Sequence, residues 1–412
     1  MTAPIVVFGA FDRHNLGDLL FAHVAEALLG ESECVFAGLA DRDLRPYGGH
    51  RVYALGAAVR EARGEQGGRI ALLHAGGEIL SCDAWQAAVM LLEPHEAERI
   101  VARLAAQPRE RERWARQALG PALGVAPTDV PRAPYVVSRA SQPELGTVVF
   151  DAVGGVDLHA CDEALRAEVS EALRSADHLS VRDEVTHAQL RGRGLDPTLI
   201  PDPAVLVAQL FGQEIRSRSD ESQELARVRD AFPAGWVATQ FSADFGDDET
   251  LESIAAQLDG VHADTGLGFA LFRAGAAPWH DSLDVLDALV SRMRTKALVF
   301  EPIHLWDICA LIAGSRGFCG SSLHGRIVAS AFGLARVNVS HPSTRTETTK
   351  QHAYATTWER EAQPGVVSLP ALGAGLRAAL AVDRGTRERD AQALASLYSE
   401  RFASIRAALV SR

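Results

Sequence analysis

Short apolar runs alternate with longer amphipathic or charged stretches along the whole chain. Apolar runs that are each followed by a loop and a helix-like stretch are typical of parallel sheets with crossover helices. In the first half, the predicted strands are residues 5–8, 34–37, 70–74, 148–152 and 179–181. In the second half, they are residues 236–241, 268–272, 297–300, 317–319 and 337–339. The pattern therefore predicts an α/β protein with two parallel sheets.

The expected division between two domains falls in a polar stretch. Residues 204–211 are apolar and strand-like, and the Ser-rich run QEIRSRSDESQE follows them within residues 212–224. Polar clusters between periodic segments are typical of loops and linkers. We therefore expect an N-terminal domain over residues 1–212 and a C-terminal domain over residues 225–385.

Two further stretches predict helices. Residues 93–116 are rich in Glu, Arg and Ala, which favours a helix that is mostly on the surface. From Arg389 onward, apolar residues recur at roughly helical spacing, namely Leu394, Leu397, Phe402, Ile405 and Leu409. Residues 386–412 are therefore expected to form a C-terminal helix, which in two-domain folds of this sort can pack back on the first domain.

Composition narrows the classes of protein and partner. The 412 residues are 47% hydrophobic and 23% charged, as in a globular protein large enough for two domains. The formal net charge is -12 and no basic block is longer than a few residues, so nucleic acid is not an expected partner. The only lysines are Lys296 and Lys350. A site for an anion must therefore use arginine, histidine or backbone N–H groups.

The chain shows no targeting or membrane signal. No basic region precedes residues 5–8, and Asp12 follows them, so the N-terminus resembles a first strand rather than a signal peptide. No apolar run approaches the roughly 18 residues of a transmembrane helix. The five cysteines lie far apart, without the spacing of a metal site. We expect a cytoplasmic enzyme with no identifiable metal ligands, whose oligomeric state and metal requirement stay open.

Two glycine-containing motifs follow predicted strands of the first half. NLGD, with Asn15, Gly17 and Asp18, comes after residues 5–8, and HAGGEIL, with Gly76 and Gly77, begins at the end of residues 70–74. A similar pair, Gly154 and Gly155, follows residues 148–152. Ligands of open α/β sheets bind beyond the carboxyl ends of strands, so these loops are candidate binding loops. Helix capping by Asn15 or Asp18 and simple tight turns are the alternatives.

Two other motifs carry side chains with acid–base or cationic chemistry. In SVRDEV, Arg182 ends a predicted strand, where it could hold an anion bidentately, and Asp183 could cap the next helix. In GFCGSSLHGR, Ser321 and Ser322 can cap a helix whose first turn contains His324. The positive end of a helix favours an anion there, and an imidazole can donate a proton. An ion-paired surface arginine and a structural histidine are the plainer interpretations.

Taken together and in this order, the motifs resemble those of the polysaccharide pyruvyl transferase family. The family pattern of an N-x-G-D loop, a glycine-rich loop, a strand-ending V-R-D/E, a P-D-P-A-like segment and a G-S-R-L-H-G corner stands here as NLGD, AGGE, SVRDE, PDPA and GSSLHGR. The resemblance covers roughly residues 5–355.

The resemblance implies a fold similar to GT-B glycosyltransferases, with two Rossmann-like domains that face a cleft. It also implies phosphoenolpyruvate as the donor substrate, with no other cofactor, and a diol of a saccharide or glycoconjugate as the acceptor. The product would be a pyruvate ketal. The implied catalytic residues are His324 and Arg182. The residues expected to bind the substrates are Asn15, Gly17, Asp18, Gly76, Gly77, Gly154, Gly155, Ser321, Ser322 and Arg326.

The sequence departs from the family pattern at two positions. Ala75 stands for the first glycine of the glycine-rich loop, and Ser322 stands for the arginine before Leu-His. Arg326 lies four residues beyond Ser322 on the same helical face, so we expect it to supply the missing positive charge.

Two other functions are compatible with the sequence. A GT-B-like glycosyltransferase that uses a nucleotide sugar would share the two-domain fold, and so would a catalytically silent binding protein, because fold does not fix function. A dinucleotide-dependent enzyme is disfavoured because no GxGxxG follows the first strand.

Overall fold

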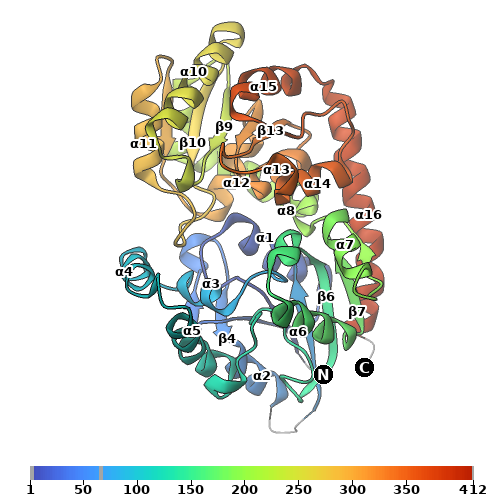
Figure 1. The fold of residues 1–412 in the computed structure, drawn as a ribbon. Helices are drawn as coiled ribbons and strands as arrows, with labels where there is room; N and C mark the ends of the chain where they lie inside the picture. Colours follow the sequence, from blue (N-terminus) through green and yellow to red (C-terminus); the bar gives the residue numbers. More distant parts are fainter. Residues whose placement is uncertain (1–3, 65–67, 411–412) are drawn as a thin grey trace. The chain divides into compact units, whose positions relative to one another are not determined.

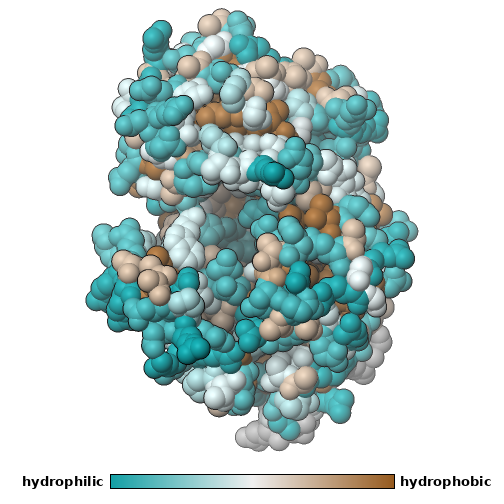
Figure 2. Space-filling view, viewed as in Figure 1, coloured by the Kyte–Doolittle hydropathy of each residue, from teal (hydrophilic) through white to brown (hydrophobic). Residues whose placement is uncertain are grey.

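The computed structural model describes residues 4–64 and 68–410, which form two compact units. Of the described residues, the first unit contains those up to Pro203 and those from Leu397 onward, and the second contains residues 204–396. Figure 1 shows helices around a sheet in each unit. On the face viewed in Figure 2, the surface of both units is mostly hydrophilic.

The first unit is built on an eight-stranded sheet in the order β3-β4-β2-β1-β5-β6-β7-β8. Every pairing in it is parallel except that of β3 with β4 among the residues described. Its central strands β1 and β5 are buried along their whole length, so they carry the core. The strands are β1 (Ile5–Phe8), β2 (Cys34–Gly38), β3 (Arg42–Asp43), β4 (Arg51–Ala54), β5 (Ile70–Ala75), β6 (Leu145–Val153), β7 (His178–Val181) and β8 (Thr198–Leu199).

The second unit is built on a six-stranded parallel sheet in the order β11-β10-β9-β12-β13-β14. Apolar side chains of α10, α11 and α15 pack on one face of it and form a single core with β9, β10 and β13. The strands are β9 (Trp236–Gln240), β10 (Gly268–Phe272), β11 (Ala297–Phe300), β12 (Gly317–Gly320), β13 (Ala335–Val339) and β14 (Val366–Val367).

The connections between the strands are mostly helical, as a parallel sheet requires. In the first unit the helices are α1 (Leu16–Leu29), α2 (Leu55–Arg63), α3 (Ala84–Val89), α4 (Pro94–Leu104), α5 (Pro108–Leu123), α6 (Glu163–Arg174) and α7 (Glu184–Arg191). The second unit begins with α8 (Val207–Glu221), α9 (Gln223–Ala231), α10 (Asp248–Thr265) and α11 (Leu283–Arg292). It continues with α12 (Leu305–Ala313), α13 (Leu323–Ala331), α14 (Lys350–Trp358) and α15 (Leu372–Ala381).

The last helix, α16 (Arg384–Val410), begins in the second unit and ends in the first. Its residues from Leu397 onward are part of the first unit, where the hydroxyl of Tyr398 donates a hydrogen bond to Asp151 on β6 at 2.5 Å. This confirms that the C-terminal helix packs back on the first domain.

The predicted α/β fold is confirmed, because each predicted strand coincides with a strand of one of the two sheets. The expected strand at residues 204–211 is wrong: these residues form a turn of 3₁₀ helix and the start of α8. A short apolar run fits a buried helix as well as a strand, which explains the error. The polar run 212–224 is helical rather than a linker, and the division between the units lies at residue 203.

The charged stretch 93–116 is helical but interrupted. α4 ends at Leu104, and α5 begins at Pro108, which occupies the first helical position. Proline suits that position because it lacks an N–H and has a fixed φ, whereas it is unfavourable in the interior of a helix. Among the helices of the described residues, none is both long and apolar enough to cross a membrane.

Candidate functional site

Each sheet has one place where the strand order reverses, and open α/β sheets bind ligands beyond the carboxyl ends of the strands at such a place. In the first sheet the order reverses between β1 and β5, and in the second between β9 and β12. The loops after β1 and β5 carry NLGD and AGGE, and the loop after β12 carries GSSLHGR. Three of the predicted motifs therefore lie at these reversal points.

In the first unit, Asn15 is committed to capping α1. Its Oδ1 accepts hydrogen bonds from the backbone N–H groups of Gly17 at 3.1 Å and Asp18 at 3.4 Å. Beside it, Arg13 lies with its Nε 4.0 Å from an Asp18 carboxylate oxygen and donates from Nη1 to the Tyr135 hydroxyl at 2.7 Å. The sequence analysis missed Arg13, which precedes the motif by two residues.

The glycine pair after β5 turns the chain sharply toward this loop. Gly76 and Gly77 have φ angles of 72° and 89°, which favour glycine. A Cβ on Gly77 would lie 3.7 Å from an Asp18 carboxylate oxygen, and one on Gly76 would lie 3.0 Å from the Phe21 ring. The structure thus brings Asp18 and the glycine pair together.

The second glycine pair, after β6, is packed rather than open. Gly154 donates to the carbonyl of Gly77 at 2.8 Å, and Gly155 donates to the Thr186 hydroxyl at 3.0 Å. A Cβ on Gly154 would lie 2.9 Å from the Arg182 guanidinium. These glycines therefore allow close packing of loops.

Arg182 lies at the centre of that packing. Its side chain is 2% exposed, and it donates to Glu78 at 2.6 Å and to Asp202 at 3.1 Å. Asp183 caps α7 by accepting from Thr186, as predicted. The guanidinium joins the loops that follow β5, β7 and β8 and touches the loop after β6. This environment differs from the expected one, since two carboxylates occupy the fork that an anion would use.

In the second unit, the corner after β12 is bonded to the loop after β9. Ser322 caps α13 by accepting from Gly325 at 3.0 Å. Ser321 donates from its backbone to the carbonyl of Gln240 at 3.0 Å, and its hydroxyl accepts from the backbone N–H of Ser242 at 3.0 Å. A Cβ on Gly320 would lie 1.8 Å from the Gln240 carbonyl, so only glycine permits this approach.

His324 lies in the first turn of α13, as predicted, and is partly exposed. Arg326, two residues further along α13, is fully buried. It donates from Nε to Glu359 at 2.9 Å and from Nη1 to the carbonyl of Gly365 at 3.0 Å. Arg336 bonds the same carboxylate at 3.0 Å. Burial raises the pKa of Glu359, but the two guanidinium charges outweigh this and hold it below its usual value.

The position of Arg326 differs from the expectation that it replaces the arginine missing at Ser322. Its side chain leaves the helix toward the protein interior, where Glu359 neutralises its charge. Helical spacing predicted the face of the residue but not what packs against that face. Arg326 therefore holds α13 against the segment at residues 359–365.

Two residues that the sequence analysis missed lie at the carboxyl end of β10. Asp281 accepts from Gln240 Nε2 at 2.7 Å and from the Ala274 N–H at 2.5 Å, and burial raises its pKa to about 7. Arg273 directly follows β10, is partly exposed, and its Nε has no hydrogen-bond partner among the described residues. Its place after a predicted strand matches that of Arg182 and was the available signal. Asp281 lies in an irregular loop that carries no motif.

A cavity of about 540 Å³ opens at the carboxyl ends of β13 and β14 in the same unit. Its lining is rich in hydroxyl groups, from Ser253, Ser340, Ser343, Thr344, Thr346 and Ser368, with carboxylates from Asp247 and Glu249. Such a surface offers many hydrogen-bond donors and acceptors to a polyhydroxylated ligand.

Solved structures similar to the chain share its fold at low sequence identity. A putative UDP-N-acetylglucosamine 2-epimerase from Listeria monocytogenes matches with a TM-score of 0.54 and 8% identity, covering 100% of this chain and 98% of its own. The enzyme from Rickettsia bellii gives 0.53 and 10%, with the same coverage. The Neisseria meningitidis enzyme, bound to UDP-GlcNAc, gives 0.51 and 9%, covering 99% of both chains. The likeness shows a GT-B-like fold.

No curated protein matches the chain. Residues 157–342 match the family model of the polysaccharide pyruvyl transferases. This span contains SVRDE, PDPA and GSSLHGR, the corner with Ser321 and His324, and the neighbouring Arg273 and Asp281. The chain thus carries a polysaccharide pyruvyl transferase domain.

Proposed function

We propose that the chain transfers the enolpyruvyl group of phosphoenolpyruvate onto a diol of a saccharide acceptor. The observation that carries the proposal is the group of side chains at the β9–β12 reversal point, within the matched span. There a histidine in the first turn of a helix, a carboxyl group of raised pKa and an arginine all follow strands of one sheet. These are the types of group that the reaction needs.

The chemistry begins with protonation of the methylene carbon of phosphoenolpyruvate. This gives an oxocarbenium-like carbon, which one acceptor hydroxyl attacks with loss of its proton. The phosphate then leaves with the C–O bond electrons, and the second hydroxyl closes the cyclic ketal. The steps need an acid, a base for the hydroxyl protons, and positive charge for the carboxylate and phosphate.

His324 and Asp281 are the acid–base candidates. A carboxyl group whose pKa is about 7 keeps its proton in a large fraction of molecules near neutral pH, which suits a general acid. His324 lies at the N-terminal end of α13, where backbone N–H groups favour an anion. Arg273 supplies a guanidinium at the same sheet edge. We assign donor binding to Arg273 and the α13 N-terminus.

The hydroxyl-lined cavity after β13 and β14 supports a saccharide acceptor. It lies at the same sheet edge as His324, because β13 pairs with β12 in parallel. Its serine, threonine and carboxylate groups match the hydroxyls of a sugar. The roles of Asn15, Gly17, Asp18, Gly76 and Gly77 in substrate binding stay predictions, with Arg13 added to them.

The test is phosphate release from phosphoenolpyruvate with a panel of glycosides that carry adjacent or 4,6-diols. We expect release only when an acceptor is present, together with a ketal methyl signal in the NMR spectrum of the product. His324→Ala should lower the rate about 10²- to 10⁴-fold with little change in melting temperature. His262→Ala, at a partly exposed histidine on α10, is the matched control.

A different outcome would favour a nucleotide-sugar transferase. If uridine diphosphate raises the melting temperature and phosphoenolpyruvate does not, the proposed donor is wrong, because a ligand that binds the native state stabilises it. Full turnover in His324→Ala would remove His324 from the mechanism while leaving the donor unaffected.

A further inference from the structure

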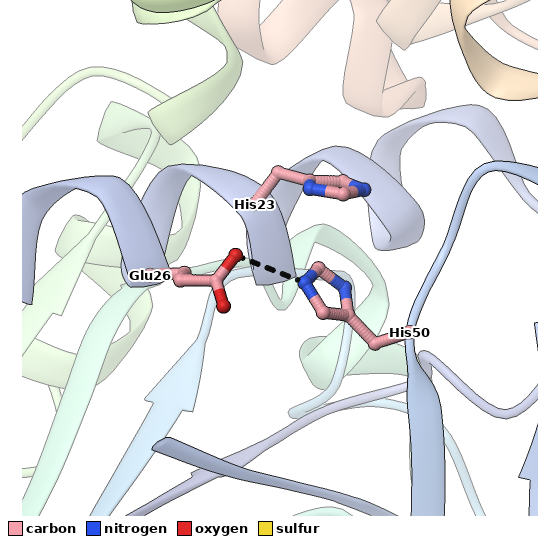
Figure 3. Close-up of side chains that lie close together, drawn as sticks. All are labelled: His23, Glu26 and His50. Atoms are coloured by element: carbon pink, nitrogen blue, oxygen red, sulfur yellow. Dashed lines mark hydrogen bonds and ion pairs between the residues drawn. The ribbon is translucent and has the colours of Figure 1, made fainter. Parts of the chain in front are cut away.

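Two histidines and a glutamate gather in the first unit, away from the reversal points. His23 and Glu26 lie one turn apart on α1, and His50 immediately precedes β4 (Figure 3). One potential ligand atom from each residue lies within 4.8 Å of those of the other two. No local sequence pattern indicates this cluster, because His50 is 24 residues from Glu26.

The spacing of the cluster suits a small divalent cation. Nε2 of His50 lies 3.2 Å from Oε2 of Glu26. Zinc binds imidazole nitrogen and carboxylate oxygen at about 2.0–2.2 Å, so two neighbouring ligand atoms of a tetrahedral site lie about 3.3 Å apart. The His50–Glu26 pair is already at that separation. The Glu26 side chain is 54% exposed and is therefore able to adjust.

Neighbouring groups fix the orientation of both rings. Nε2 of His23 donates to the carbonyl of Gly48 at 2.7 Å, which leaves the lone pair on Nδ1. A ligand histidine commonly donates its other ring N–H to a backbone carbonyl in this way. The His50 ring packs on the Phe36 ring with centroids 3.9 Å apart. Rings held in place lose little freedom when a metal binds.

The cluster lies at the opposite edge of the sheet from the candidate binding loops. His50 precedes β4, which is parallel to β2, so it stands at the amino end of these strands. Substrates of open α/β sheets bind beyond the carboxyl ends of the strands. A metal here would instead join α1 to the segment before β4.

We propose that His23, Glu26 and His50 bind one divalent transition-metal ion of the zinc class, with water as a further ligand, in a structural role. Two imidazoles and one carboxylate suit zinc and disfavour magnesium, which prefers oxygen ligands. The proposal is independent of the pyruvyl transfer proposed above, because its measurements are metal content and stability.

The experiment uses the full chain, purified without a metal-binding tag, dialysed against a chelator and titrated with Zn²⁺ or Mg²⁺. We expect one tightly bound zinc per chain by mass spectrometry of the metal, and a higher melting temperature with Zn²⁺ only. Glu26→Gln should weaken zinc binding by about 10- to 100-fold or more, since even the loss of an outer partner costs that much. His23→Ala/His50→Ala should abolish binding at this site.

The matched control is His95→Ala/Glu98→Gln. These residues have the same spacing on α4, are exposed, and have no second histidine beside them in the described structure. The control should bind zinc like the wild type. Wild-type affinity in Glu26→Gln, or no zinc retained by the wild type, would overturn the proposal. Because the Glu26 side chain is half exposed, Glu26→Gln decides the question even if loss of His50 impairs folding.

Discussion

Asp281 shows how its surroundings can give an ordinary side chain unusual chemistry. Burial raises the pKa of this carboxyl to about 7, although the N–H groups of Ala274 and Gln240 and the charge of Arg273 all favour its ionised form. Carboxyl groups in such environments are recurrent general acids. Its position at the β9–β12 reversal point makes the raised pKa relevant to the proposed reaction.

For the first prediction, Asp281→Asn should lower turnover about 10²- to 10⁴-fold. If the protonated carboxyl is the acid, wild-type activity should fall as pH rises above about 7, because the proton is lost there. That fall should be absent from the residual activity of the variant. Initial rates of phosphate release between pH 5.5 and 9 measure both effects. The control is Asp287→Asn, an exposed residue of α11.

Substitutions of Arg273 and Arg326 should have different effects, one on substrate binding and the other on stability. Arg273→Ala should raise the KM for phosphoenolpyruvate with little loss of stability, because the residue is partly exposed and its Nε has no hydrogen-bond partner among the described residues. Arg326→Ala should destabilise the fold by about 3–5 kcal/mol, because it leaves Glu359 buried beside a single arginine. Steady-state kinetics and urea unfolding of both variants provide the test. Similar behaviour of the two variants would contradict it.

Sequence reasoning succeeded at this scale where the signal is local. Asn15, Asp183 and Ser322 cap helices as predicted, because a cap depends on residues two or three positions away. It did not foresee that Arg182 and Arg326 are buried. Their partners, Asp202 and Glu359, are 20 and 33 residues away in the chain, and charge pairing at that range has no local signature.

At the scale of elements, Arg182 links the carboxyl ends of neighbouring strands. Its guanidinium bonds Glu78 after β5 and Asp202 after β8, and it lies against Gly154 after β6. One side chain thereby fixes the carboxyl edge of four neighbouring strands. The same contacts of Arg182 would position the loops after β5 and β6 for binding a substrate.

Arg182→Ala should therefore destabilise the first unit by about 3–5 kcal/mol, because the buried carboxylate of Asp202 and the partly buried carboxylate of Glu78 lose their cation. Arg174→Ala, which breaks an exposed pair with Glu171 on α6, should cost at most about 1 kcal/mol. Urea unfolding gives both values. Arg182→Lys tests the expectation from the sequence that Arg182 binds the anionic donor. Weaker binding of phosphoenolpyruvate by this variant, at unchanged stability, would support that expectation.

The strands that were predicted have mainly apolar runs, most clearly β1 and β5, where every residue is buried. The strands that were missed, β3, β4, β8 and β14, have two to four residues at or near the sheet edges. So short a segment shows at most two periods of alternation, which is too few to distinguish it from a loop. Its pairing is decided by the neighbouring strand and cannot be inferred from its own sequence.

At the scale of the molecule, the same arrangement occurs once in each unit. Both sheets reverse their strand order once, and both carry predicted motifs in the loops at the reversal. The order of strands within a sheet is not encoded in any local pattern. The sequence therefore identified candidate binding loops but not which loops are neighbours, such as the loops of Gln240 and Ser321.

The C-terminal helix contacts a buried carboxyl group, that of Asp151, whose ionisation makes the stability of the whole chain depend on pH. Tyr398 on α16 donates to Asp151 on β6, and these residues are 247 positions apart. Burial raises the pKa of Asp151 to about 7, while the hydrogen bonds from Tyr398 and Ser180 oppose the rise. An unfolded aspartate has a pKa of about 3.9.

Between these two values the folded chain holds a proton that the unfolded chain has released. The contribution of Asp151 to stability is therefore fully present below about pH 4 and is lost as pH rises through about 7. Asp151→Asn cannot ionise, so it should gain stability relative to the wild type as pH rises from 4 to 8. The variant can still accept the Tyr398 hydrogen bond through its amide oxygen.

Urea midpoints of the wild type and Asp151→Asn at several pH values measure this difference. The comparison is needed because Asp12 and Asp281 also have raised pKa values, about 6 and about 7, and they affect both proteins equally. Tyr398→Phe serves as a second variant: it removes a bond to the ionised carboxylate and should steepen the loss of stability above pH 7. A constant difference between wild type and Asp151→Asn from pH 4 to 8 would show that Asp151 titrates at its ordinary pKa.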